Sequence, residues 1–183
     1  MRIIAGEFKS RKLESLKGDT TRPTLDKVKE SIFNRIGPYF DEMKMLDVFT
    51  GSGNIAFEFL SRGIQQVTIV ERDPQAQRIV ELNIRNLKVE NRVKFLKMDS
   101  FKAVKLLKET FDYIYIDPPY RFNKFEKLMK LLEPLTHEST LLLYESDSKQ
   151  EPIEVENYEL IRSDVYGHTR VTHYLIKPKQ LTD

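Results

Sequence analysis

The sequence has no cysteine among its 183 residues and only three histidines. Without cysteine, the chain forms no disulfide bond and offers no thiolate as a nucleophile or a metal ligand. The three histidines show no HExxH spacing, so a catalytic zinc site is not expected. We therefore expect a fold held by packing and hydrogen bonds, with a chemistry of oxygen and nitrogen groups and no metal.

Long hydrophobic runs are also missing. No apolar stretch approaches the roughly 20 residues that a helix needs to cross a bilayer, and residues 1–6 are charged too early for a signal peptide. We therefore expect a cytoplasmic protein without membrane contact. The length predicts one main domain, residues 23–183, with a small appendage, residues 1–22, in a monomer.

Positive charge is concentrated near the N-terminus. The net charge is only +2, but residues 1–36 hold nine Lys or Arg against five Asp or Glu. A basic segment on a nearly neutral body is typical of an arm that contacts phosphate. A mildly basic, solvated surface would explain the same charge balance equally well.

The first 22 residues read as a small β-hairpin. Residues 3–5 and 12–16 are short strand candidates, and the predicted RNA-binding residues Phe8, Lys9, Arg11 and Lys12 lie at and between them. One aromatic ring among cations suits RNA, because bases stack and phosphates pair. Arg22 is either a surface cation or a residue that reaches an anionic group near the glycine loop described next.

The stretch from residue 45 to residue 62 predicts a strand, a tight glycine loop and a helix. An apolar run interrupted by Asp47 is typical of a strand buried on both faces, and Gly51, Ser52 and Gly53 follow it. The glycines permit positive φ and close approach of a ligand, and the helix N-terminus favours an anionic group. We expect Asp47, at the strand end, to face the same opening.

Glu71 narrows the choice of ligand. It lies twenty residues after Gly51, at the end of a second apolar run, residues 67–70. In a nucleotide-binding α/β fold, an acid in this position holds ribose hydroxyls. A dinucleotide and S-adenosyl-L-methionine (SAM) both fit so far, and a tight turn without a ligand stays an alternative.

The rest of the chain alternates strands and helices. Gly37 and Pro38 end a first helix, for which Thr24 is a plausible N-cap, and Pro74 opens a later one. Further strands are expected at residues 93–98, 113–116 and 141–144, and further helices after Ser100 and at residues 125–132. Two strands without a helix between them, residues 158–166 and 171–177, follow. This rhythm predicts an α/β fold with a doubly wound, mostly parallel seven-stranded sheet and one antiparallel edge strand.

Four acids share one position in this pattern. Asp47, Glu71, Asp99 and Asp117 each follow a predicted strand, and such ends meet at the ligand-binding edge of a parallel sheet. Glu71 would accept from ribose hydroxyls and Asp99 from an adenine amine. Arg72 and Ser100 follow two of these acids and belong to the predicted cofactor site. Acids are also common in such loops without any ligand.

The segment Asp117-Pro118-Pro119-Tyr120 favours one chemistry. Two prolines fix the backbone and remove two donors, so carbonyl and carboxylate acceptors remain beside an aromatic ring. Such a pocket suits a planar group with an exocyclic NH₂, whose N–H bonds reach Asp117 and the Pro118 carbonyl while Tyr120 stacks. An oxidoreductase that uses a dinucleotide leaves this segment unexplained, and a non-catalytic RNA-binding module leaves the strand-end acids unexplained.

These motifs carry a resemblance to a known family. D-V-F-T-G-S-G followed by D-P-P-Y resembles the amino-group branch of the class I SAM-dependent methyltransferases, which are Rossmann-like. The opening R-I-I-A-G, the block T-R-P-T-L-D-K-V-K-E-S-I-F-N and Tyr166-Gly167 resemble the RsmD family over nearly the whole chain. Ser10 departs from the pattern, because the family often has glycine at this point of the hairpin.

The resemblance implies an activity and a partner. It implies methyl transfer from SAM to guanine N2 of 16S ribosomal RNA, at the nucleotide called G966 in bacterial numbering, with naked RNA or a small-subunit assembly particle as the partner. Gly51, Ser52, Gly53, Glu71 and Asp99 would bind SAM, and residues 117–120 the guanine. Methylation of adenine N6 or cytosine N4, in RNA or DNA, is the nearest alternative.

Overall fold

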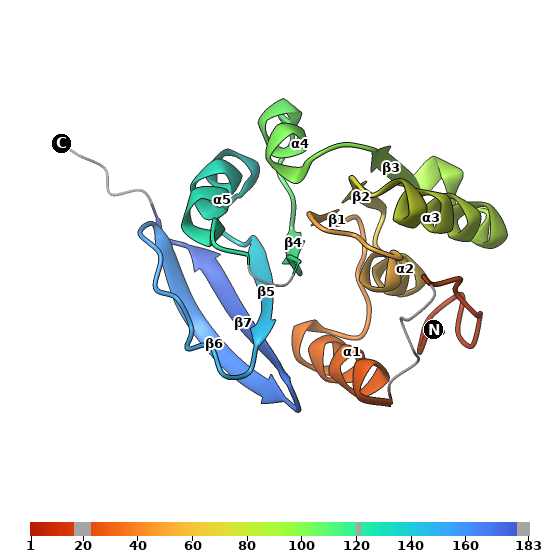
Figure 1. Cartoon of the computed structure of the whole chain (residues 1–183), viewed down its shortest axis with the longest axis horizontal. Coiled ribbons are helices and arrows are strands. Elements are labelled where there is room, and N and C mark those ends of the chain that lie inside the picture. The colour runs from red at the N-terminus through yellow and green to blue at the C-terminus, as the bar shows by residue number, and fades with distance from the viewer. Residues whose placement is uncertain (17–22, 120–121, 179–183) are drawn as a thin grey trace.

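The computed structural model describes residues 1–16, 23–119 and 122–178, and Figure 1 shows its arrangement. The strands are β1 (Lys44–Asp47), β2 (Gln66–Val70), β3 (Val93–Leu96), β4 (Tyr113–Ile116), β5 (Leu141–Asp147), β6 (Tyr158–Tyr166) and β7 (Thr169–Ile176). The helices are α1 (Pro23–Ile36), α2 (Asn54–Ser61), α3 (Pro74–Leu87), α4 (Ser100–Leu106) and α5 (Phe125–Leu132), with short 3₁₀ turns η1 (Glu90–Arg92) and η2 (Glu133–Leu135).

The seven strands form one sheet in the order β3-β2-β1-β4-β5-β7-β6. Strands β1 to β5 pair in parallel, and β7 runs antiparallel to both of its neighbours. This confirms the predicted mostly parallel, doubly wound sheet. The antiparallel strand β7 lies one place inside the edge, and β6 forms the edge itself, because the two strands form one long hairpin (Figure 1).

Helices cover both faces of the sheet, and each face has its own core. Alternate residues of a strand enter different cores: Met45 packs with α1, α2 and α3, whereas Leu46 packs with α4 and α5. The same alternation divides Tyr115 from Ile114 and Ile116 on β4. Strands buried on both faces explain the continuous apolar runs of the sequence.

The helix starts follow local chemistry. Asp73 caps α3 by accepting from the backbone of Gln75 and Ala76, and Pro74 occupies the first turn as predicted. The prediction that Thr24 caps the first helix is wrong, because α1 already begins at Pro23.

The longest helices have 14 residues. In the described part of the chain, no helix is long and apolar enough to cross a membrane.

The N-terminal segment is part of the main core. Ile3 and Leu13 are buried among residues of α1 and α2. The two predicted strands of the hairpin do not form, and a single antiparallel bridge joins Arg2 to Lys12. The backbone N–H groups of residues 4 and 5 donate to the Glu58 carboxylate of α2 at 2.9 and 3.1 Å, so they are not available to extend a strand ladder.

Candidate functional site

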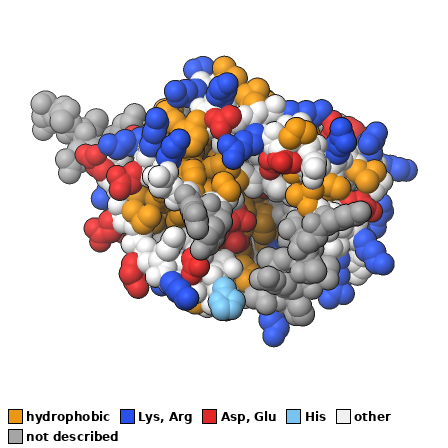
Figure 2. All heavy atoms as spheres, viewed as in Figure 1, with side chains coloured by type: hydrophobic (Ala, Val, Ile, Leu, Met, Phe, Trp, Pro, Cys, Tyr) orange, Lys and Arg blue, Asp and Glu red, His pale blue; other side chains and the backbone are white. Residues whose placement is uncertain are grey.

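The carboxyl ends of the parallel strands surround a cavity of about 810 Å³. Asp47, Glu71, Asp99 and Asp117 all line it, so the structure brings together the four acids that the sequence placed at strand ends. On this face of the molecule, Figure 2 shows acidic side chains at the centre, hydrophobic side chains beside them and Lys or Arg along the upper edge. The cavity is therefore an acidic hollow with apolar walls.

The glycine loop forms one wall of the cavity. Gly51 has φ of +56°, and a Cβ built there would meet no atom within 4 Å, so the space over it is open to a ligand. Gly53, with φ of +84°, is tightly packed instead, because a Cβ would lie 2.3 Å from the ring of Phe57. Ser52 and Gly51 line the cavity. Both glycines thus occupy left-handed conformations, but only Gly51 leaves room for a ligand.

Glu71 is already oriented by the backbone around it. Its Oε2 accepts from Gly51 N at 2.9 Å, and its Oε1 accepts from Asp73 N at 2.7 Å. The carboxylate thereby links the glycine loop to the start of α3. Each oxygen keeps a second lone pair for a ligand hydroxyl. The neighbouring side chain, Arg72, is exposed and also lines the cavity.

Asp99, which follows β3, caps the N-terminus of α4. Asp99 accepts from the backbone of Phe101 and Lys102 through Oδ1 at 3.1 and 3.3 Å. Ser100 is buried, and its hydroxyl donates to the Val48 carbonyl at 2.7 Å, which fixes α4 against β1. Both residues line the cavity. The side chain of Ser100 thus positions the wall rather than presenting a free hydroxyl.

Asp47 ends β1 and Asp117 directly follows β4, and both carboxyl groups line the cavity. Asp47 is almost fully buried, and its Oδ1 has no hydrogen-bond partner among the described residues. Burial, together with nearby Asp117, raises the pKa of Asp47 well above the usual range. Asp117 stays accessible from the cavity, yet the protein around it raises its pKa to about 6. Pro118 and Pro119 line the cavity beside it, whereas Tyr120 lies outside the described residues. An unpartnered buried carboxylate oxygen is costly, and a ligand donor would satisfy it.

One pair of hydrogen-bonded cavity residues was missed by the sequence analysis. Tyr115 and Glu145 line the cavity, and the Tyr115 hydroxyl donates to Glu145 Oε1. The predicted fifth strand stopped at Tyr144, but β5 continues to Asp147. A signal was present, because Glu145 follows an apolar run in the same way as the four predicted acids.

Aromatic rings form a second unpredicted feature. Phe49, Phe101 and Phe122 line the cavity, with ring centroids 5.4 Å apart for Phe49 and Phe122 and 6.3 Å apart for Phe101 and Phe122. The Lys124 ammonium lies 5.9 Å from the Phe101 ring centroid. These rings provide apolar faces on which planar bases can stack.

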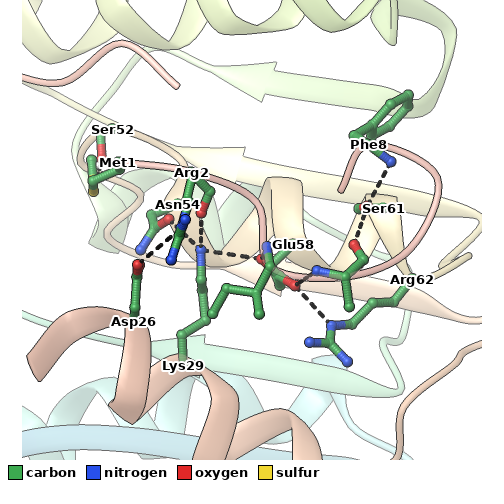
Figure 3. A network of polar contacts seen from close by, with 12 residues as sticks. Met1, Arg2, Phe8, Asp26, Lys29, Ser52, Asn54, Glu58, Ser61 and Arg62 are labelled. Carbon is green, nitrogen blue, oxygen red and sulfur yellow. Dashed lines mark hydrogen bonds and ion pairs between the residues drawn. The ribbon is translucent and has the colours of Figure 1, made fainter. Parts of the chain in front are cut away.

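The N-terminal segment also reaches the cavity. Met1, Leu16 and Lys29 line it. The Lys29 ammonium donates to the Arg2 carbonyl at 2.6 Å and to Asn54 Oδ1 at 2.9 Å, and it pairs with Glu58 at 3.1 Å (Figure 3). These contacts join the segment, α1 and the start of α2. The segment is therefore part of the cavity wall as well as a candidate arm.

The predicted RNA-binding residues differ in exposure. Lys9 and Lys12 are exposed, and Arg11 is exposed but donates to the Asn86 carbonyl at 2.6 Å. Phe8 is half-buried and packs against the first core, which reduces the ring surface available for stacking. Arg22 lies outside the described residues.

The cavity fits the expected cofactor. Open space over Gly51 and the orphaned oxygen of Asp47 suit a bulky ligand that carries donors and positive charge, as SAM does. In the described ranges no cluster of three histidine or acidic side chains is arranged to hold a metal ion.

Comparison with known proteins identifies the family. The family model described as "Conserved hypothetical protein 95" matches residues 1–175. A Bacillus subtilis protein, YlbH, whose name proposes an rRNA methyltransferase, is 39% identical over 95% of this chain and 98% of its own. Ribosomal RNA small subunit methyltransferase D of Haemophilus influenzae is 35% identical over 91% and 89%. The solved structure of Escherichia coli yhhF, described as a proposed methyltransferase, superposes with a TM-score of 0.85 at 26% identity, covering 98% of this chain and 99% of that one. The chain therefore belongs to the RsmD family, the family of ribosomal RNA small subunit methyltransferase D.

Proposed function

We propose that this protein methylates the exocyclic N2 amine of a guanine in 16S ribosomal RNA, at the site called G966. The observation that carries the proposal is the position of Asp117, Pro118 and Pro119, which open from β4 into the cavity that also contains Gly51. The hydrogen-bond acceptors at residues 117–119 and the glycine loop therefore line the same cavity. The names of related proteins, which act on ribosomal RNA of the small subunit, support the RNA substrate.

The cofactor, SAM, supplies a methyl group that is already activated as part of a sulfonium. The protein therefore needs to hold the acceptor amine in line with that methyl group, and positioning can contribute about 7–11 kcal/mol in the best cases. Glu71 and the backbone of Gly51 bind and orient the cofactor, and Asp99 forms the adenine end of the same wall. Met1, Phe49 and Ile55 are apolar residues of the cavity lining and would exclude water.

The acceptor base is held by Asp117 and the backbone after it. The Asp117 carboxylate and the Pro118 carbonyl accept the two N–H bonds of the amine. These contacts favour a more tetrahedral nitrogen and stabilise its developing positive charge. Because the cavity is enclosed by strand ends, the target base must leave its stack to reach Asp117. Tyr120 stacks on the base in this proposal, and Phe122 and Phe49 provide further ring faces nearby.

RNA approaches along the side of the cavity that carries exposed cations. Lys9 and Lys12 extend from the N-terminal segment, which itself borders the cavity through Met1 and Leu16. Arg11 and Arg22 complete the proposed phosphate contacts, and Phe8 supports the segment by packing below it. Residues 1–22 thus act as the RNA-binding arm, and residues 23–183 as the methyltransferase domain.

The test is single-turnover methyl transfer to 16S ribosomal RNA, naked and in assembly particles, with the product nucleoside identified by mass spectrometry. N2-methylguanosine is the expected product. Asp117→Ala should lower the transfer rate far more than the affinity for SAM, because its contact is made mainly in the transition state. Asp117→Asn should retain partial activity, because the amide keeps one acceptor. A methyl group on adenine N6, cytosine N4 or a ring nitrogen would contradict the proposal.

A further inference from the structure

Glu145 lies in the acceptor half of the cavity, and the sheet register brings it beside Asp117. In the parallel pairing of β4 with β5, Tyr115 is opposite Leu143 and Ile116 is opposite Tyr144. The next residues along these two strands are Asp117 and Glu145. Side chains two residues apart along a strand share a face, so Tyr115, Asp117 and Glu145 project from the same side of the sheet.

Among the described residues, the Tyr115 hydroxyl is the partner of one carboxyl oxygen of Glu145, and the other oxygen has none. It donates to Oε1, so this contact occupies one oxygen and orients the carboxyl group, and Oε2 is left for a ligand. Glu145 is half-buried and lines the cavity together with Asp117. A carboxyl oxygen beside the acceptor pocket is a candidate for a general base, which has to lie within hydrogen-bond reach of the proton that it accepts.

The electrostatic surroundings of Glu145 are acidic. Asp117 and Asp47 both raise its pKa, burial raises it most, and the Tyr115 hydrogen bond lowers it in part, so that the pKa is about 8. On β7 the residue opposite Glu145 is the apolar Val171. On α1, which covers this face, the Lys29 ammonium is engaged by Glu58 and two further acceptors.

An independent observation points to a cationic or proton-donating ligand in this place. Asp47, which pairs with Tyr115 in the β1–β4 register, is almost fully buried, and within the described part of the chain its Oδ1 has no hydrogen-bond partner. Three carboxyl groups therefore face one enclosure without enough donors from the described residues. A positively charged centre and an amine that loses a proton would satisfy this arrangement.

We propose that Glu145 is a catalytic base, which accepts through Oε2 the proton that the target amine loses during methyl transfer, and that Tyr115 is its positioning residue. This inference rests on the proposed function. The amine nitrogen gains a bond to the methyl carbon and loses one N–H bond. The electron pair of the broken carbon–sulfur bond stays with sulfur, the pair of the N–H bond stays with nitrogen, and the proton goes to Glu145. Asp117 holds the amine while this happens.

The activity test compares Glu145→Gln with wild type in single-turnover transfer from pH 6 to pH 9 at saturating SAM. Glutamine has the same shape and can still accept from Tyr115, so the fold is expected to persist. The wild-type rate should rise with pH to a plateau above about pH 8. The variant should keep only the smaller rise near pH 6 that belongs to Asp117, and it should transfer about 100-fold more slowly at the plateau, the lower range for general-base catalysis. Asp147→Asn is the matched control, because Asp147 is an exposed acid two residues further on the same strand.

A second readout needs neither cofactor nor RNA. In the ligand-free protein, carboxyl-group NMR should show a coupled pair with ionisation steps near pH 6 and pH 8. Glu145→Gln should abolish the upper step and keep the lower one, because the neutral amide replaces a group that ionises second. If a glutamate carboxyl step near pH 8 persists in the variant, the assignment of Glu145 is wrong. Asp47, whose pKa is also raised, is told apart by its aspartate chemical shift.

Tyr115→Phe keeps the test decisive if Glu145→Gln fails to fold. Removing the hydroxyl removes a contact that lowers the pKa of Glu145, so the rising limb of the rate profile should move to higher pH. The inference would be overturned if the rising part of the pH–rate profile stayed at the same pH in Tyr115→Phe, or if Glu145→Gln transferred at the wild-type rate at every pH. A wild-type protein that transfers no methyl group to guanine N2 would instead refute the proposed function, and the NMR steps would still report on the carboxyl pair.

Discussion

Lys29 on α1 and Glu58 on α2 form an ion pair in which Nζ and Oε2 are 3.1 Å apart and both side chains are almost completely buried, at 1% and 0% exposure. Glu58 also accepts from Arg62 Nε at 3.0 Å and from the backbone of Ile4 and Ala5 (Figure 3). Burial lowers the pKa of Lys29, and the Glu58 carboxylate opposes that effect. One buried carboxylate thus joins the N-terminal segment to α1 and α2, beside further contacts such as those of Ser61 with Ala5 and Phe8.

Lys29→Met should destabilise the protein by about 3 kcal/mol, the lower end of the range for breaking a buried ion pair, because Glu58 loses its ammonium partner but keeps Arg62. The measurement is urea denaturation of the ligand-free protein. Lys94→Met is the control, since the Lys94–Glu109 pair has the same chemistry at 2.8 Å but is partly exposed. That control should cost no more than about 1 kcal/mol. Equal losses for the two variants would contradict the structural role assigned to Lys29.

Deletion of the N-terminal segment is a poor test of RNA binding for the same reason. It would remove the donors of Ile4 and Ala5 from Glu58 and part of the cavity wall at Met1 and Leu16. Point substitutions at exposed cations separate the two roles of the segment.

Replacing Lys9 and Lys12 together with alanine should weaken RNA binding and leave SAM affinity unchanged. Both side chains are exposed, and the structure gives them no part in the cavity wall. The dependence of log K on log salt concentration should become shallower by about 1.4, because each neutralised phosphate of a single strand adds ~0.7 to the slope. Filter binding over a salt series and calorimetry with SAM measure the two effects. Lys130→Ala with Lys149→Ala removes the same charge elsewhere on the surface, and an equal decrease in RNA affinity with this pair would contradict the arm.

Ser10 offers a test of the turn in the same segment. Its φ is +68°, a left-handed conformation that costs a residue with a side chain about 1–2 kcal/mol. Because glycine loses more chain entropy on folding, Ser10→Gly should stabilise the protein by only about 1 kcal/mol or less. Ser15→Gly, in the same segment without a positive φ, should destabilise it. The free energy of unfolding is the measurement, and a loss of stability for Ser10→Gly would show that the turn does not constrain this residue.

Glu71→Ala should weaken SAM binding by about 1–3 kcal/mol, the usual range for a hydrogen bond to a charged group. The carboxylate holds Gly51 N and is proposed to accept from ribose hydroxyls. Calorimetry with SAM and its demethylated product measures the loss. Glu90→Ala, at an exposed acid outside the cavity, is the control. Unchanged affinity in a folded Glu71→Ala protein would remove Glu71 from the cofactor site.

The features that could be predicted from the sequence are those that depend on residues close together in the chain. Buried strands, the glycine loop and strand-end acids such as Asp47 and Asp117 could be recognised because each is a local pattern, and the parallel sheet then brings them together. Lys29 was not recognised, although it lies three residues before Ile32 and four before Phe33, on the apolar face of the helix. Its partner could not be predicted, because only the packing of α1 against α2 brings it to Glu58. Glu145 could have been recognised, because it directly follows an apolar run, but its hydrogen bond with Tyr115 depends on the pairing of β4 with β5.

The stability of the ligand-free protein should depend on pH through the cavity carboxyls. The pKa of Glu145 rises from 4.5 to about 8 on folding, so the folded state binds its proton more tightly than the unfolded state does. That contribution is fully present below pH 4.5, falls as the pH rises, and is lost above about pH 8. The pKa of Asp117, which rises from 3.8 to about 6, acts on stability in the same direction at lower pH.

Glu145→Gln removes the contribution of Glu145, so from pH 6.5 to pH 9 the Tm of the variant should decline less than that of wild type. The lowered pKa of His173 has the opposite sign but acts below its ordinary value of 6.5 and is common to both proteins. Thermal unfolding followed by circular dichroism at a series of pH values measures the difference, and parallel Tm curves would show that Glu145 is not held in its protonated form.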